Sequence, residues 1–115
     1  MKITPLDTVE KKKIESDELK GVSKQLPVGS ADGAPNFSMR VFTVEPGGFT
    51  PYHAHPWEHE NYVLKGAGVM RNEAGEDTPI RAGDFALVLP NEKHQFRNTG
   101  SEDLQFICLV PKEHE

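Results

Sequence analysis

Residues 47–60 read Gly47-Gly48-Phe49-Thr50-Pro51-Tyr52-His53-Ala54-His55-Pro56-Trp57-Glu58-His59-Glu60, and they contain three of the chain's five histidines. In an extended strand, residues two apart point to the same face, so His53 and His55 project together. Because a bend follows at Pro56, His59 can approach the same point from the next strand. The stretch therefore indicates a metal site built on β-strands.

A fourth histidine, His94, follows the turn Pro90-Asn91-Glu92-Lys93 and begins another strand-like run. That run must lie beside the first group of histidines for the site to close. Imidazole nitrogens suit zinc, copper, iron and nickel, and they also hold manganese where geometry and supply allow. The fifth histidine, His114, lies in a polar tail and is interpreted as an ordinary surface residue. Glu58 and Glu60 fall on the face opposite His59, which favours a surface or supporting role over ligation.

Composition excludes several classes of function. A chain of 115 residues is one domain, and its net charge of -5 argues against nucleic acid as a partner. No stretch approaches the roughly 20 apolar residues that span a bilayer, and no secretory leader pattern opens the chain, so we expect no membrane partner. The single cysteine, Cys108, lies in an apolar run and favours a reduced, packed thiol in the cytoplasm.

The strand pattern predicts an all-β fold. Short runs rich in Val, Phe, Leu and Ile alternate with glycine, proline or asparagine turns, at residues 37–44, 59–64, 68–72, 78–81, 85–89, 94–98 and 104–110. The runs at 59–64 and 68–72 are interpreted as a hairpin. Residues 1–36 are expected to form an arm, with one short strand, and an edge strand at 21–28. They belong to the same domain as a barrel at 37–115, since closure removes exposed edges.

The two histidine clusters resemble the two conserved motifs of the cupin superfamily. The residues that carry this resemblance are Gly47, His53, His55, His59 and Gly66 in the first motif, and Gly83, Asp84, Pro90, His94 and Asn98 in the second. The pattern is most similar to small single-domain bacterial cupins that bind manganese through four histidines. The resemblance implies a double-stranded β-helix, a jelly-roll-like barrel, commonly paired in a homodimer.

Two departures from the cupin pattern affect the function. His59 stands where most cupins carry glutamate, and the second motif lacks its inner glycine and shifts Pro90 by one residue. The implied ligands are therefore four histidines, His53, His55, His59 and His94. Manganese is the first expectation, with iron, nickel, copper or zinc as alternatives. Function does not transfer from oxalate- or quercetin-degrading cupins, whose chemistry often relies on that carboxylate.

Strand alternation and the resemblance together predict the pocket lining. Phe106 and Cys108 share an apolar face of the last strand, which we expect to point inward. Arg40 could hold a substrate carboxylate, or it could be a solvated or interface arginine. The predicted pocket residues are Arg40, Phe42, Trp57, Phe96, Phe106 and Cys108. Tyr62 and Leu64 would point outward, where an apolar surface fits burial in a dimer.

The leading functional hypothesis is a metal-dependent oxidoreductase of dioxygenase type acting on a small organic molecule. A six-coordinate ion held by four histidines keeps two open positions, whereas a tetrahedral zinc site has none and would be structural. No general base is apparent beside the metal. The alternatives are a cupin that binds or senses a small molecule without turnover, and a metal-dependent isomerase or lyase.

Overall fold

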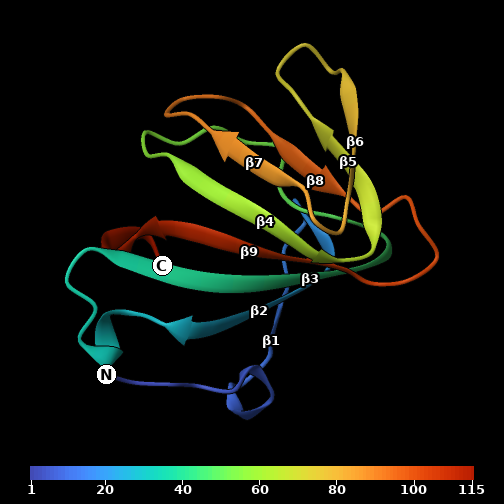
Figure 1. Ribbon diagram of the computed structural model, residues 1–115. Coiled ribbons are helices and arrows are strands. Elements are labelled where there is room, and N and C mark those ends of the chain that lie inside the picture. Colours follow the sequence, from blue (N-terminus) through green and yellow to red (C-terminus); the bar gives the residue numbers. More distant parts are fainter.

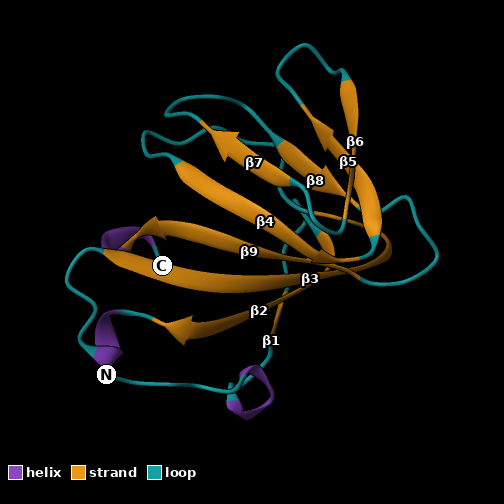
Figure 2. Ribbon diagram, viewed as in Figure 1, coloured by secondary structure: helices purple, strands orange, loops and turns teal.

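The computed structural model describes residues 1–115 and is built from one curled sheet (Figures 1 and 2). Its strands are β1 (Lys12–Ile14), β2 (Lys20–Val28), β3 (Phe37–Phe49), β4 (His59–Lys65), β5 (Ala67–Arg71), β6 (Asp77–Arg81), β7 (Phe85–Val88), β8 (Gln95–Arg97) and β9 (Leu104–Pro111). The only helices are 3-10 turns: η1 (Leu6–Thr8), η2 (Ser30–Asp32) and η3 (Lys112–His114). None of them has the length or apolar character to cross a bilayer. The predicted all-β fold is confirmed.

The sheet runs in the order β6-β5-β8-β3-β9-β4-β7, with β2 beside β3 and β1 beside β2. All of its paired strands are antiparallel. With one exception, the predicted strands match the observed ones to within one residue at either end. Local alternation and turn residues were therefore sufficient to place most strands.

The exception is β3, which does not end at residue 44 as predicted. From Phe37 to Val44 it pairs with β9, and at Phe49 it pairs with Arg97 of β8. Between these two segments Gly47 has a φ of 79°, and its N–H donates to the carbonyl of Asn98 at 3.1 Å. The glycines thus bend the strand instead of terminating it, and β3 changes partner at the bend.

The predicted hairpin between residues 59–64 and 68–72 was also wrong. β4 pairs with β7 and β9, whereas β5 pairs with β6 and β8. Gly66 lies between them with a φ of 83°, and a Cβ there would come within 2.3 Å of the Asp103 carbonyl oxygen. The turn therefore sends the chain to the other half of the barrel rather than back along β4.

The core fills the inside of this curl. It consists of nine buried side chains from six strands: Val22, Val44, Val63, Ile80, Phe96, Leu104, Phe106, Cys108 and Val110. Burial of each large apolar side chain contributes roughly 2 kcal/mol. As predicted, Phe106 and Cys108 point inward from β9, and Leu104 is buried on the same face.

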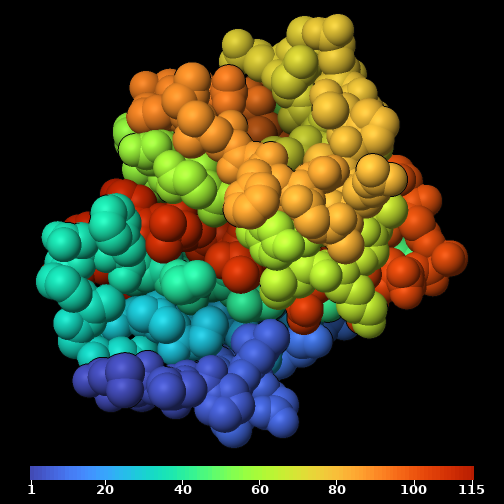
Figure 3. All heavy atoms as spheres, viewed as in Figure 1, coloured from blue at the N-terminus to red at the C-terminus, as the bar shows by residue number.

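The N-terminal arm is held against the barrel by Gln25 of β2. This buried side chain donates to the carbonyl oxygens of Leu6 and Val9, both at 3.1 Å. Figure 3 shows the arm, in blue, lying along one edge of the molecule beside β2. Ile14 and Leu19 follow in the chain and pack on the core cluster. The arm therefore closes one side of the barrel interior.

Candidate metal centre and its pocket

The two histidine clusters meet through a backbone bridge. His53, in the segment after β3, accepts from His94 N–H at 3.0 Å and donates to its carbonyl at 3.2 Å. The carbonyl of His55 accepts from Asn91 N–H at 2.7 Å, which fixes the second contact between the segments. His59 is the first residue of β4. The expectation that the His94 strand lies beside the first cluster is confirmed.

Three histidines meet the geometry of a shared ion. The ligand nitrogens of His53, His55 and His94 all lie within 4.8 Å of one another. The buried His59 borders the same point, with its Nε2 3.0 Å from Nε2 of His94 and its ring centroid 5.2 Å from that of His55. The protein can therefore hold a metal ion with three histidines, and a fourth lies in contact with them.

Hydrogen bonds determine which nitrogen of each ring faces the centre. Nδ1 of His55 lies 2.8 Å from the carbonyl oxygen of Trp57, and Nδ1 of His94 lies 2.8 Å from that of Glu92. A carbonyl only accepts, so in both rings Nδ1 carries the proton. The Nε2 atoms are then left with free lone pairs, which is the tautomer that a metal requires.

His59 is oriented in the same way by a side chain. Its Nδ1 lies 2.7 Å from Oδ1 of Asn61, whose amide nitrogen donates to the Ile107 carbonyl at 3.3 Å. Because that second bond uses the NH₂ group, Oδ1 must be the acceptor for His59. Two unprotonated Nε2 atoms, those of His59 and His94, consequently face each other.

Such facing lone pairs repel unless a proton or a cation lies between them. Burial, and then the neighbouring His94, lower the pKa of His59 to about 3, so a shared proton is disfavoured at neutral pH. Two imidazole nitrogens at about 2.1 Å from one ion, at right angles, would be separated by about 3.0 Å. The donor set therefore fits a metal ion.

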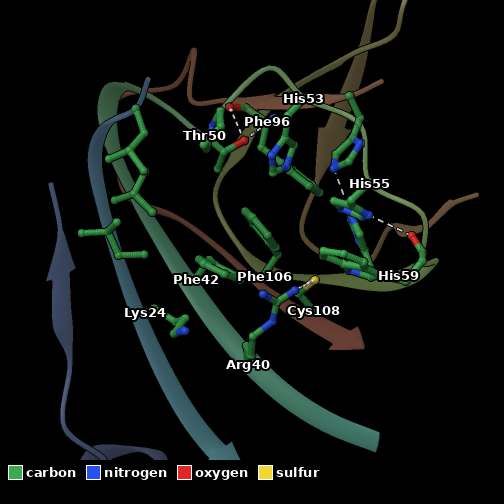
Figure 4. Close-up of a pocket in the computed structure, with 16 residues that line it drawn as sticks. Lys24, Arg40, Phe42, Thr50, His53, His55, His59, Phe96, Phe106 and Cys108 are labelled. Carbon is green, nitrogen blue, oxygen red and sulfur yellow. Dashed lines mark hydrogen bonds between the residues drawn. The ribbon is translucent and has the colours of Figure 1, made fainter. Parts of the chain in front are cut away.

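The four histidines line part of a pocket of about 290 Å³ inside the barrel (Figure 4). All six residues predicted for it lie in its lining: Arg40, Phe42, Trp57, Phe96, Phe106 and Cys108. Burial raises the pKa of the Cys108 thiol, despite the nearby Arg40, so the thiol stays protonated at neutral pH. The lining contains no Asp, Glu or Tyr.

The contribution of the N-terminal residues to this lining was not predicted from the sequence. Ile14, Leu19, Val22 and Lys24 close the pocket on the side of β1 and β2. Alternation in the predicted edge strand already placed Val22 and Lys24 on one face, but it did not show that this face was turned inward. Thr50 and Pro51 complete the lining beside His53.

Trp57 lies in a column of stacked rings. Its ring is 4.3 Å from that of His55, at an interplanar angle of 7°, and the ring of His114 covers its other face at 3.7 Å and 4°. His114 was interpreted as an ordinary surface residue, and only the folded position of η3 reveals this contact.

Glu60 faces the outside of the barrel with Tyr62, as strand alternation predicts.

Residues 40–110 match the family model of the cupin domain. The chain belongs to the cupin family. Its sequence is 39% identical over 66 residues to the oxalate-binding protein of Thermotoga maritima, covering 56% of this chain and 54% of that protein. It is 33% identical over 101 residues to auxin-binding protein 1 of Arabidopsis thaliana, covering 80% and 51%. This cupin thus spans about half the length of these curated relatives.

Solved structures show the same barrel. The polyketide cyclase RemF of Streptomyces resistomycificus superposes with a TM-score of 0.90 and 28% identity, covering 96% of this cupin and 79% of that chain. The predicted oxalate decarboxylase of Thermotoga maritima superposes with a TM-score of 0.85 and 25% identity, covering 96% and 99%. The cupin barrel predicted from the motifs is therefore confirmed.

The depressed pKa of His59 predicts how the metal-free fold responds to acid. In the unfolded chain His59 has its ordinary pKa of 6.5 and becomes protonated below that pH. In the folded chain it becomes protonated only near pH 3. The free energy of unfolding should therefore fall as the pH drops from 6.5 towards 3. Urea denaturation of metal-free protein across this range, compared with His59→Gln, measures the effect. Parallel curves for the two proteins would contradict it.

Proposed function

We propose that this cupin is an enzyme that acts on a small organic molecule at a divalent metal held by His53, His55, His59 and His94. The observation that carries the proposal is the convergence of unprotonated Nε2 atoms at one end of a pocket large enough for a small ligand. His59 is included because its Nε2 faces that of His94 and its Nδ1 is already occupied by Asn61.

Manganese is the proposed metal, with iron, nickel, copper or zinc as alternatives. Imidazole nitrogens suit zinc, copper, iron and nickel and also hold manganese, and the four-histidine set resembles that of small manganese-binding cupins. If the bound ion is six-coordinate, four histidines would leave two positions for a substrate or dioxygen.

The proposed reaction is an oxidation of the dioxygenase type. A bound redox-active ion with open positions would supply oxygen chemistry, and it would also polarise a substrate oxygen. The chain's own residues bind and orient the substrate and exclude water, since aromatic and aliphatic side chains make half of the lining. No carboxylate is present there to act as a base. This favours chemistry that needs no protein carboxylate.

A second candidate is an oxygen-independent, metal-assisted isomerisation or ring closure. The likeness to the polyketide cyclase supports it, since the two chains superpose over 96% of this cupin. A third is binding without turnover, which the names of the oxalate-binding and auxin-binding relatives support. These candidates differ in their need for dioxygen and in whether a product forms.

We also propose a homodimer, formed through the outer face of the sheet. Phe85 is 82% exposed and Leu87 is 55% exposed on β7. Phe85 also lines a largely apolar hollow, whose other lining residues are Met39, Glu60, Asn61, Tyr62, Ile107 and Leu109. Such a contiguous apolar surface is costly in water. A two-fold axis would bury this surface against the same surface of a second copy.

We propose a cytoplasmic location. The free, buried Cys108 is compatible with the reducing environment of the cytoplasm.

The reaction class is tested by oxygen dependence. A panel of small aromatic and aliphatic acids is incubated with manganese-loaded protein in air and under argon, while an oxygen electrode and mass spectrometry follow the mixture. We expect conversion only in air, with label from ¹⁸O₂ in the product, and none with His94→Ala. Equal conversion under argon would favour ring closure or isomerisation. Tight binding without any product would favour a binding protein.

The dimer is tested by light scattering after gel filtration. The wild-type protein should have twice the 12.8 kDa mass of one chain. Phe85→Asp should shift it towards the monomer, because a buried carboxylate would have no partner. Ile3→Asp is the control, since Ile3 is 81% exposed on the N-terminal arm and should leave the dimer intact. A wild-type monomer would contradict the proposal.

A further inference from the structure

We propose that Lys24 and Arg40 form a carboxylate-binding subsite on the β2 and β3 side of the pocket, and that the substrate is a planar aromatic carboxylic acid. The inference rests on the proposed function, since it concerns the substrate of the same pocket. It adds Lys24 and the N-terminal arm to the site, and it narrows the substrate from any small organic molecule to one chemical class.

Neither cation of this pair has an acidic partner. The ion pairs of the protein are Lys2–Asp32, Lys12–Glu10 and Arg71–Asp77, and none involves the pocket. Because the lining holds no Asp or Glu, nothing in it neutralises these charges. A divalent ion would add two further positive charges. An acidic protein of net charge -5 therefore encloses a positive pocket, which selects an anion.

Arg40 is poised for a ligand rather than engaged by the protein. Its Nη2 lies 2.8 Å from Sγ of Cys108, which is a weak acceptor, and its buried Nε has no hydrogen-bond partner. A buried donor without a partner is costly, and a carboxylate would satisfy it. Figure 4 shows the guanidinium extending from β3 into the pocket towards Cys108.

Lys24 supplies the second charge from the neighbouring strand. Its cross-strand partner on β3 is Phe42, two residues from Arg40, so both cations lie on the same side of the pocket. Burial is the main cause that lowers the pKa of Lys24, and the positive charge of Arg40 is the second, as expected for two cations on one side of a pocket. Glu115 acts on this amine less than Arg40 does, and its carboxylate accepts hydrogen bonds from Ser30 and Ser38.

Aromatic rings line the pocket beside the two cations. The Arg40 guanidinium lies 4.9 Å from the ring centre of Phe42, which stacks on Phe106 at 5.7 Å and 27°. Phe106 in turn stacks on Phe96 at 4.0 Å and 15°. A flat, apolar wall beside Arg40 favours a planar ring whose carboxylate reaches the two cations. The other end would carry an electron-rich group near the histidines.

The test compares benzoate with benzamide, its neutral isostere, by calorimetric titration of the metal-loaded chain. The wild-type protein should prefer benzoate by about tenfold or more, and Lys24→Gln and Arg40→Gln should each reduce that preference severalfold. Arg40→Lys should retain much of it, because the charge remains. Lys20→Gln is the matched control on β2, since Lys20 is exposed and lies outside the lining. Circular dichroism confirms that each variant is folded.

The same titrations after removal of metal by EDTA separate this inference from the proposed function. A preference for benzoate that survives EDTA and is lost in the two glutamine variants supports the subsite, even if no metal-dependent turnover is found. A preference that disappears with EDTA and persists in Lys24→Gln and Arg40→Gln would mean that the carboxylate binds the ion, which would overturn the proposal. Equal wild-type affinities for benzoate and benzamide would also overturn it.

Discussion

The backbone pairing of His53 with His94 is the contact on which the candidate metal centre depends. These two residues lie 41 positions apart in the chain, and their reciprocal hydrogen bonds bring the two histidine clusters to one point. The pairing is possible because β3 bends at Gly47 and passes from β9 to β8. A single bent strand therefore connects the barrel core to the metal centre, and packing of that core holds the imidazoles in place.

The charge of the pocket depends on the absence of Asp and Glu from its lining. Burial lowers the pKa of His59 and of His94 and so favours their neutral forms, while hydrogen bonds from Nδ1 turn their Nε2 lone pairs inward. With His59 in the position where most cupins carry glutamate, no carboxylate reduces the charge of a bound ion. Arg40 and Lys24 add positive charge from β3 and β2. On the proposed function, this charge would favour electron-rich and anionic molecules beside an apolar wall.

Much of this fold could be predicted from local sequence. Alternation and glycine turns placed most strands to within a residue, and the spacing of the histidines indicated their meeting point. The partner exchange of β3 and the separation of β4 from β5 could not be predicted, because they depend on backbone torsion at Gly47 and Gly66 and on pairing between distant strands. The inward turn of Lys24 was hidden for the same reason.

The central claim is that four imidazoles hold one ion, and the most direct measurement is a count of the coordinated imidazoles. Protein purified without added metal would be analysed for its elements, loaded with manganese, and examined by pulsed electron paramagnetic resonance. The account predicts one ion per chain with four imidazole nitrogens, three in His59→Ala, and four in His114→Ala. An imidazole count and a metal content that are unchanged in His59→Ala would contradict it.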